Sequence, residues 1–401
     1  MIRPTVALAA LTLALARPLA AEPDPADWDA VLAEAEGQTV YFHAWGGAEP
    51  SNAHIAWAGE TVAARHGVTV EHVKLSDTAN AVSRVLAERQ AGRDTGGAVD
   101  LIWINGENFA AMKRAGLLFG PWAEDVPNWA LVDRDKPVTT DFTVPTEGME
   151  APWTLAQLVF FHDAARLPEP PRTLPALLDW AAANPGRFTY PQPPDFLGST
   201  FLKQALTMLT PDRAVLAGPV EEADYAAATA PLWAYLDELT PHLWRAGRAY
   251  PATGPRLIQL MADGEIDVGL TFNANELTAA IEGVRLQDSV RAYVPEGGTL
   301  GNVSFLAIPY NASAKAGAMV LANFLMGPEA QARQQDPAHW GLNTVLDMEA
   351  LAPGDRARFE ALEIGRAALP PEEMGPALPE PHPSWMVALE EDWTARYGTG
   401  D

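Results

Sequence analysis

The sequence predicts an α/β fold with two domains, each built on a mostly parallel sheet flanked by helices. Apolar segments alternate with amphipathic helical segments over the first third of the chain, which is typical of parallel strands joined by right-handed crossovers. At 401 residues the chain is too long for one ordinary hydrophobic core. Its 13 Trp and 35 Pro residues indicate buried aromatic clusters and ordered turns rather than disorder.

Glycines end several of the predicted helices in the first third. Gly67, Gly92 and Gly116 each follow a helical segment, and Ser76 or Asp77 caps the helix that ends at Gly92. The elements predicted here are a helix over 26–35, a strand over 39–44, a helix over 55–66, a strand over 68–75, a helix ending at 92, a strand over 99–104 and a helix ending at 116.

A nearly continuous apolar strand is predicted over 155–161, after a turn-rich passage over 120–152. It is too apolar for an exposed face, so we expect it to lie in a second sheet or to cross between two sheets. Thr173 starts the next helix, and Ser313 caps a later one. The other elements predicted are a stiff proline-rich loop over 190–200, helices over 201–209, 225–239, 254–261, 316–325 and 385–396, strands over 267–272 and 303–308, and a proline-rich strap over 369–383.

The first 21 residues have the pattern of an export signal. Arg3 precedes an apolar run over 5–16, and the small residue Ala21 comes before Glu22. A buried N-terminal helix is the alternative, but Pro18 would end it. The run is too short to span a bilayer, and no later segment reaches the ~18 consecutive apolar residues of a membrane helix. We therefore expect cleavage after Ala21 and a soluble periplasmic protein.

Composition excludes several classes of function. The formal charge is -25, which becomes -27 when Arg3 and Arg17 leave with the signal, so phosphate backbones are repelled and nucleic-acid binding is not expected. The absence of cysteine excludes disulfides, thiol catalysis and thiolate metal sites. The eight histidines lack the spacing of a zinc helix, so we expect no metal and no cofactor.

Nine residues are candidates for binding a small ligand, and most follow strand ends, where open α/β sheets bind ligands. Trp45 has two interpretations: its indole ring stacks on a flat or cationic solute, or it is a residue of the hydrophobic core. Glu107 contacts the ligand, or is a first-turn acid favoured by the helix dipole. Asn275 contacts the ligand, or caps a helix. The full set is Trp45, Asn105, Glu107, Asn108, Trp153, Asp195, Asn273, Asn275 and Glu276.

Three acidic or aromatic features leave further alternatives open. Trp153 lies beside the predicted crossing strand, where it contacts the ligand or packs at a hinge. Asp195, in the stiff loop, pairs with a cationic group or is an exposed loop aspartate. The acidic run over 390–392 is interpreted as a solvated helix face. Carboxylates are numerous enough that an acid pair of the glycosidase type stays open.

In their order and spacing, four segments resemble the periplasmic solute-binding proteins of ABC importers, in the two-lobed group of maltose, polyamine and iron receptors. More narrowly, the segment over 103–119 followed by Gly120, Pro121 and Trp122 is similar to the YnjB-type receptors, which have been labelled thiamine receptors. The four segments are 100–116, the crossing strand over 155–163, the proline-then-helix element over 170–180, and 298–324.

The resemblance implies a type II periplasmic binding protein fold, with crossing strands near 153–157 and 302–305 and a solute held between the lobes. Hinge closure traps the solute because the closed state contacts it from both lobes. The division that we expect is a signal peptide over 1–21, lobe I over 22–153 and 303–340, lobe II over 154–302, and C-terminal helices with the proline-rich strap over 341–401.

The resemblance also implies a monomeric receptor, not an enzyme, that delivers its solute to an inner-membrane permease driven by a cytoplasmic ATPase. Acidic and aromatic candidates with amides favour a small organic cation such as thiamine. A polyol or short sugar is the alternative ligand, because Trp stacking with Asn and Asp hydrogen bonds suits it too. An exported carbohydrate-active enzyme and a sensor module that reports a solute to a membrane partner are the competing functions.

Overall fold

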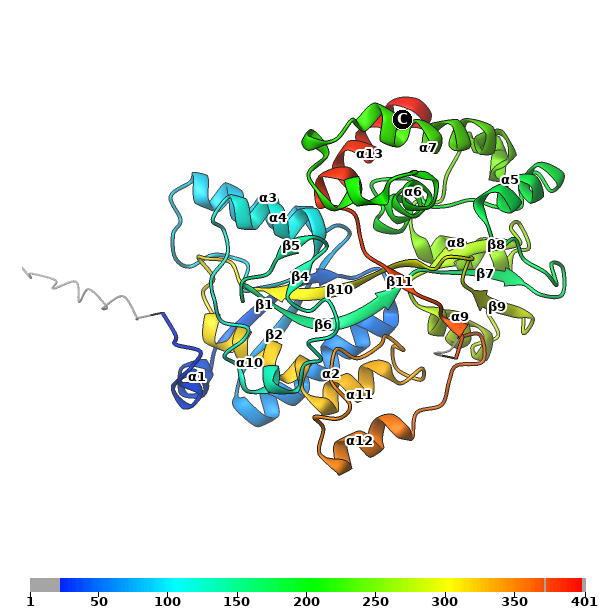
Figure 1. The fold of residues 1–401 in the computed structure, drawn as a ribbon. Coiled ribbons are helices and arrows are strands. Elements are labelled where there is room, and N and C mark those ends of the chain that lie inside the picture. Colours follow the sequence, from blue (N-terminus) through cyan, green and yellow to red (C-terminus); the bar gives the residue numbers. More distant parts are fainter. Residues whose placement is uncertain (1–21, 371–372, 399–401) are drawn as a thin grey trace, which may run out of the picture.

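The computed structural model describes residues 22–370 and 373–398, which form two lobes, each with its own hydrophobic core (Figure 1). The lobes are joined where β6 (Glu150–Gln157) runs antiparallel to β10 (Thr299–Ala307). The predicted two-lobed α/β class is confirmed. The predicted signal peptide lies outside the described residues. In the described ranges, no helix combines the length and apolarity needed to cross a bilayer.

The first lobe is built on a mixed sheet in the order β11-β10-β3-β1-β2, with β6 also paired to β10. The three strands β1 (Thr39–Trp45), β2 (Thr69–Leu75) and β3 (Leu101–Ile104) are parallel, as the alternation of elements predicts. The returning strand β10 is antiparallel to β3. The helices with this lobe are α1 (Trp28–Ala35), α2 (Glu49–His66), α3 (Ala79–Gln90), α4 (Gly106–Arg114), α10 (Lys315–Met326), α11 (Pro328–Gln335) and α12 (Pro353–Glu360).

The second lobe has a three-stranded sheet in the order β8-β7-β9. Here the expectation of a mostly parallel sheet is wrong, because the central strand β7 is antiparallel to both neighbours. The elements of this lobe are β7 (Val159–Asp163), β8 (Val268–Thr271), β9 (Val290–Tyr293), α5 (Leu174–Ala183), α6 (Phe196–Leu209), α7 (Tyr225–Leu239), α8 (Gly254–Ala262), α9 (Ala274–Glu282) and α13 (Pro383–Tyr397).

The apolar run over 155–161 forms parts of two strands rather than one. β6 ends at Gln157 and pairs with β10, whereas β7 begins at Val159 and pairs with β8 and β9. Leu158 lies between them and donates its N–H to the Leu300 carbonyl at 2.8 Å. The run therefore crosses from one sheet to the other.

Helix boundaries agree with the sequence where a local residue decides them. Gly67 ends α2 in the left-handed conformation, and Thr173 caps α5 by accepting a hydrogen bond from the Ala176 N–H. Elsewhere a tertiary contact decides. The N-cap of α10 is Ala314 rather than Ser313. The Asp100 carboxylate accepts hydrogen bonds from the backbone N–H groups of Ser313 at 2.7 Å and Ala314 at 2.9 Å.

The strap between α12 and α13 is a third connection along the crossing strands (Figure 1). Its short strand β11 (Ala377–Leu378) pairs with β10. The Gln157 side-chain amide donates to the Met374 carbonyl at 3.0 Å. The strap then enters α13, whose Trp385, Leu389 and Trp393 are buried in the core of the second lobe. The minor strands β4 (Thr140–Asp141) and β5 (Val144–Pro145) pair with each other near α4.

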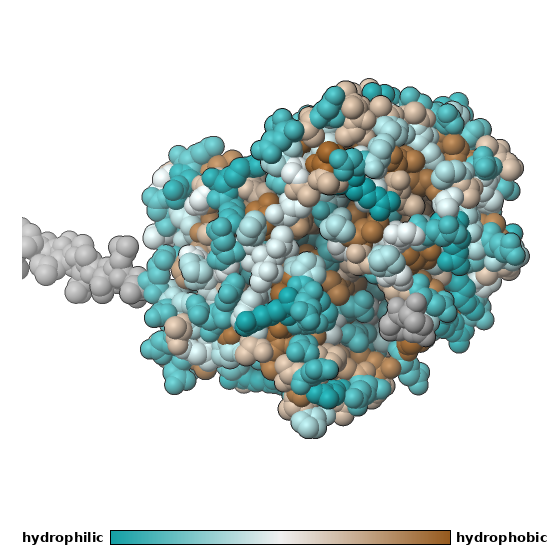
Figure 2. All heavy atoms as spheres, in the orientation of Figure 1, coloured by the Kyte–Doolittle hydropathy of each residue, from teal (hydrophilic) through white to brown (hydrophobic). Residues whose placement is uncertain are grey.

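Polar and charged side chains cover much of the face shown in Figure 2, with smaller apolar areas between them on both lobes. This agrees with the formal charge of -25 over the whole sequence. Such a surface favours solubility and repels other polyanions.

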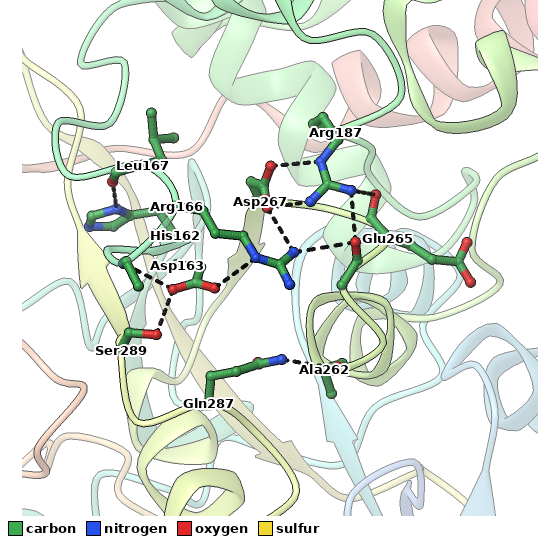
Figure 3. Close-up of polar contacts among 12 residues, drawn as sticks. His162, Asp163, Arg166, Leu167, Arg187, Ala262, Glu265, Asp267, Gln287 and Ser289 are labelled. Atoms are coloured by element: carbon green, nitrogen blue, oxygen red, sulfur yellow. Dashed lines mark hydrogen bonds and ion pairs between the residues drawn. The ribbon is translucent and has the colours of Figure 1, made fainter.

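An ion-pair network lies beside the sheet of the second lobe, and Asp267 lies between Arg166 and Arg187 in it (Figure 3). Arg187 contacts both Asp267 oxygens, with Nε to Oδ2 at 2.6 Å and Nη2 to Oδ1 at 2.5 Å. Arg166 reaches Asp267 at 3.3 Å and Asp163 at 3.4 Å. The Ser289 hydroxyl donates to Asp163 at 2.5 Å. The network links the residues around β7, β8 and β9.

Asp267→Asn is expected to lower the free energy of unfolding by about 2–3 kcal/mol, because Arg187 keeps its partly desolvated charge and loses its anionic partner. The side chains of Arg187 and Asp267 are only 29% and 13% exposed. The matched control is Asp288→Asn in the exposed pair Arg366–Asp288, with an expected loss below about 0.5 kcal/mol. Denaturant titration of both variants measures the difference, and equal losses would contradict this account.

Candidate functional site

The carboxyl ends of the three parallel strands bring several polar and aromatic residues to one edge of the first lobe's sheet. Trp45 ends β1 opposite Leu75 of β2, and Asn105 follows β3. The Thr78 hydroxyl, just after β2, donates to the Trp103 carbonyl at 3.3 Å. This edge is where open α/β sheets bind ligands.

The turn into α4 is held from outside by a residue that the sequence did not indicate. Gly106 has φ of +59° and donates its N–H to Asp141 Oδ2 at 2.7 Å. A Cβ at Gly106 would lie 2.8 Å from the Phe142 ring, so only glycine fits there without a shift. Asn105 is the N-cap residue, but its side chain makes no capping hydrogen bond. Asp141, buried on β4, therefore fixes the direction of the α4 turn.

Glu107 has an unused carboxylate oxygen. Its Oε1 accepts a hydrogen bond from the Asn108 amide at 2.6 Å, while Oε2 is buried without a partner in the described residues. Burial is the main cause that raises the pKa of Glu107 to about 7; the backbone N–H of Glu107 and the Lys203 charge oppose the rise, and the negative charges of Asp77 and Glu380 contribute to it. The carboxyl is therefore suited to take either a proton or a cation.

Helix α6 of the second lobe begins at Phe196, earlier than predicted, because Asp195 caps it. Asp195 Oδ1 accepts the backbone N–H groups of Leu197 at 3.1 Å and Gly198 at 3.4 Å. Burial raises the pKa of this half-buried carboxyl to about 6. Ser199 consequently lies inside the helix and not in the loop.

A buried ion pair joins α6 to the strap. Lys203 Nζ lies 2.7 Å from Glu380 Oε2, and both side chains are 1% exposed. Glu380 Oε1 accepts a hydrogen bond from the Asn302 amide of β10 at 2.9 Å. The Lys203 ammonium also lies 4.4 Å from the Phe142 ring centroid and 5.2 Å from that of Phe196. Lys203 and Glu380 are not among the residues predicted from the sequence, where a lysine within a mostly apolar helix was the available signal.

Helix α13 adds another carboxyl to the same place. Glu390 Oε1 accepts the Ser199 hydroxyl at 2.5 Å, and α13 packs against both α6 and α4. Burial raises the pKa of Glu390 to about 7, and the charge of Glu107 acts in the same direction. The interpretation of 390–392 as a solvated face is wrong for two of its residues, since Asp392 is half-buried and accepts the Tyr225 hydroxyl at 3.0 Å.

The resulting interlobe cluster contains four carboxylates and one ammonium. Glu107 and Asp77 come from the first lobe, Lys203 and Glu390 from the second, and Glu380 from the strap. The charge of Glu107 raises the pKa of Glu390, and α13, which carries Glu390, packs against α4, which carries Glu107. The interlobe cluster is Asp77, Glu107, Lys203, Glu380 and Glu390.

Two half-exposed tryptophans lie at the same sheet edge. The rings of Trp45 and Trp103 meet edge to face, with centroids 6.5 Å apart. Trp153 is fully buried behind them, 4.9 Å from Trp103, and its indole N–H has no partner in the described residues. Trp340 lies 5.3 Å from Trp153 and completes the packing. Trp153 thus supports the tryptophan surface from the core side.

The turn into α9 faces the first lobe at a different point. Asn273, not Asn275, is the N-cap, and its amide donates to the Trp340 carbonyl at 2.7 Å. The Asn275 amide donates to the Gly341 carbonyl at 2.8 Å. Glu276 is hydrogen-bonded to the Thr271 hydroxyl, and burial raises its pKa to about 7.

The structure brings Glu107 into the interlobe cluster, with Asn108 hydrogen-bonded to it, but no hydrogen bond in the described residues joins either of them to the α9 turn. Aromatic packing lies between the two turns, since the Trp340 ring, whose backbone carbonyl binds Asn273, is 5.7 Å from the Trp103 ring. In the ranges 22–370 and 373–398, no group of three or more His, Asp or Glu side chains is arranged to hold a metal ion.

Residues 57–341 match the family model of the bacterial extracellular solute-binding proteins. The chain belongs to this family. It is also 46% identical to protein YnjB of Escherichia coli K12 over 373 residues, which are 93% of this chain and 94% of YnjB. The narrower resemblance to YnjB-type receptors is thereby confirmed.

Solved structures of periplasmic binding proteins share the fold of this solute-binding protein. AfuA of Actinobacillus pleuropneumoniae, solved with fructose-6-phosphate, has a TM-score of 0.63 at 13% identity and covers 90% of this chain and 99% of its own. Iron-bound HitA of Pseudomonas aeruginosa has a TM-score of 0.60 at 16% identity, with 88% and 98% covered. The spermidine/putrescine protein PotD of Streptococcus pneumoniae has a TM-score of 0.58 at 13% identity, with 90% and 98% covered. Such different ligands mean that the fold does not identify the solute.

Proposed function

We propose that this solute-binding protein captures a small organic cation between its lobes in the bacterial periplasm and delivers it to an inner-membrane ABC permease with its cytoplasmic ATPase. The family supports the receptor role. A monomer that changes no bond in the solute suffices for this role, so we propose no catalytic residues. The lobe division that we propose remains 22–153 with 303–340, and 154–302, in line with the two hydrophobic cores.

One observation supports a cation in particular: Glu107 on α4 and Glu390 on α13 come from opposite lobes on helices that pack together, and within the described residues Glu107 Oε2 is buried without a partner. A cation between them would gain two charged contacts only when the lobes are closed, and this difference drives closure. Trp45 and Trp103 would supply ring faces and edges beside it. We include Glu107, Asn108, Trp45 and Glu390 in the proposed site.

The remaining sequence candidates have weaker support as ligand contacts. Asp195 uses one oxygen for helix capping, and Asn273 and Asn275 donate to backbone carbonyls. Trp153 has no exposed surface. In our proposal Asn273 and Asn275 hold the lobes in register, and Asp195 positions α6. Asn105 precedes α4 without capping it, and Glu276 bonds within its own lobe, to Thr271.

Native mass spectrometry of protein purified from periplasm without refolding tests the proposal. We expect a retained organic cation, with thiamine as the first compound to compare, and a smaller radius of gyration in small-angle scattering when that cation is added. Its binding should also raise the melting temperature, because a ligand that binds only the folded state adds stability. Retention of a neutral sugar would favour a polyol or sugar receptor, and turnover of a sugar polymer would favour an enzyme; either result would overturn the proposal.

A further inference from the structure

We propose that the Lys203 ammonium permanently occupies one of two cation-binding positions in the interlobe cluster, the one beside Glu380, and thereby limits the solute to a single positive charge. The other position, beside Glu107 and Glu390, is left for the solute. This inference rests on the proposed function, because it specifies which cations the same site accepts. It concerns residues that the resemblance to receptor families did not indicate.

The surroundings of the Lys203 ammonium have the composition of a cation-binding cage. Two aromatic rings, Phe142 from the first lobe and Phe196 from the second, lie 4.4 and 5.2 Å from Nζ at their centroids. The Glu380 carboxylate lies 2.7 Å away. Aromatic rings with a carboxylate are how proteins recognise ammonium ligands. Here the protein's own side chain occupies that cage.

The cage is closed off from solvent and has a fixed partner. Both Lys203 and Glu380 side chains are 1% exposed, and the second Glu380 oxygen is taken by the Asn302 amide at 2.9 Å. Removing one member of such a pair leaves a buried, uncompensated charge. Glu380 is therefore committed to a cation at the Lys203 position, whichever molecule carries it.

The other half of the cluster is left for the solute. Within the part of the chain that the structure describes, Glu107 Oε2 has no partner, and Glu390 Oε1 accepts the Ser199 hydroxyl at 2.5 Å. Ser199, which donates to Glu390, lies one helical turn before Lys203 on α6, so a solute cation held by Glu107 and Glu390 lies beside the Lys203 ammonium. A second positive charge on the solute would need the cage that Lys203 already fills. The raised pKa of each carboxyl, about 7, favours a single positive charge in the same way.

Lys203→Ala tests this directly, because it empties the cage and leaves Glu380 without a cation. The probes are n-butylamine, with one positive charge, and 1,4-diaminobutane, with two. We expect the variant to bind 1,4-diaminobutane at least about tenfold more tightly than the wild type does, measured by titration calorimetry at pH 7. The gain for n-butylamine should be smaller, since it fills only one of the two halves.

The double variant Lys203→Ala/Glu380→Gln is the matched control, and it should lose the gain because the cage no longer carries a charge. Equal diamine affinity in wild type and Lys203→Ala, or a gain that survives Glu380→Gln, would overturn the inference. If Lys203→Ala is unfolded alone, circular dichroism during the same titration should show the diamine restoring the fold, and no recovery would equally overturn it. The proposed function is tested by a different result: it fails if the native solute retained by the wild type is neutral, whatever the diamine titrations show.

Discussion

Replacing Glu107 with glutamine is expected to weaken binding of a cationic solute by at least about tenfold, because a buried charged partner is typically worth more than ~1.4 kcal/mol. Glutamine keeps the shape and one acceptor oxygen, so the change removes charge rather than volume. Titration calorimetry of wild type and variant with the retained solute measures the loss.

Stability without ligand should be unchanged or slightly higher in Glu107→Gln. Burial raises the pKa of the wild-type carboxyl from 4.5 to about 7, so its ionisation lowers the stability of the fold progressively between these pH values and by a constant amount above pH 7; glutamine removes this cost. Glu391→Gln, at an exposed neighbour of Glu390 on α13, is the control for net charge and should bind like the wild type. A neutral ligand would leave the affinity of Glu107→Gln nearly unchanged, and that result would argue against the cation.

Local patterns sufficed to predict much of the first lobe. β1, β2 and β3 with their following helices lie where strand-like runs and glycines such as Gly67 place them, because these signals act within a few residues. Glu107 and Asn108 could be predicted as site candidates for the same reason, since they directly follow an apolar strand. The direction of the strands in the second lobe could not be predicted in this way, because β7 takes its direction from the crossing of β6 and not from its own residues.

The rest of the candidate site depends on contacts between distant parts of the chain. Lys203, Glu380 and Glu390 come together only when the strap folds back along β10 and places α13 beside α6 and α4. Likewise, Asp141 holds the Gly106 turn from 35 positions away. Lys203 differs from ordinary surface lysines only by its mostly apolar helix, and nothing in the local sequence separates Glu380 and Glu390 from ordinary surface acids. The acidic run over 390–392 therefore predicts a solvated helix face.

Affinity for the cationic solute should rise with pH and level off above about pH 7. Burial raises the pKa values of Glu107 and Glu390 to about 7, so below that pH both carboxyls mostly carry protons in the ligand-free protein. A bound cation favours the ionised carboxyls, so binding must release protons and is opposed by acid. For one such carboxyl the ionised fraction rises about thirtyfold between pH 5.5 and pH 8, and this sets the expected gain in affinity.

Calorimetry with a solute whose own charge is constant in this range measures the effect, and repeating it in buffers of different ionisation enthalpy counts the protons released. Burial lowers the pKa of His43 and His162, and protonation of these histidines by acid is a second source of pH dependence, so pH dependence alone does not identify the groups. The double variant Glu107→Gln/Glu390→Gln does, because it keeps every histidine and removes both carboxyls. Its affinity should be weak and nearly flat with pH, whereas a double variant that retained the wild-type pH profile would place the titrating groups, and with them the cation, elsewhere in the molecule.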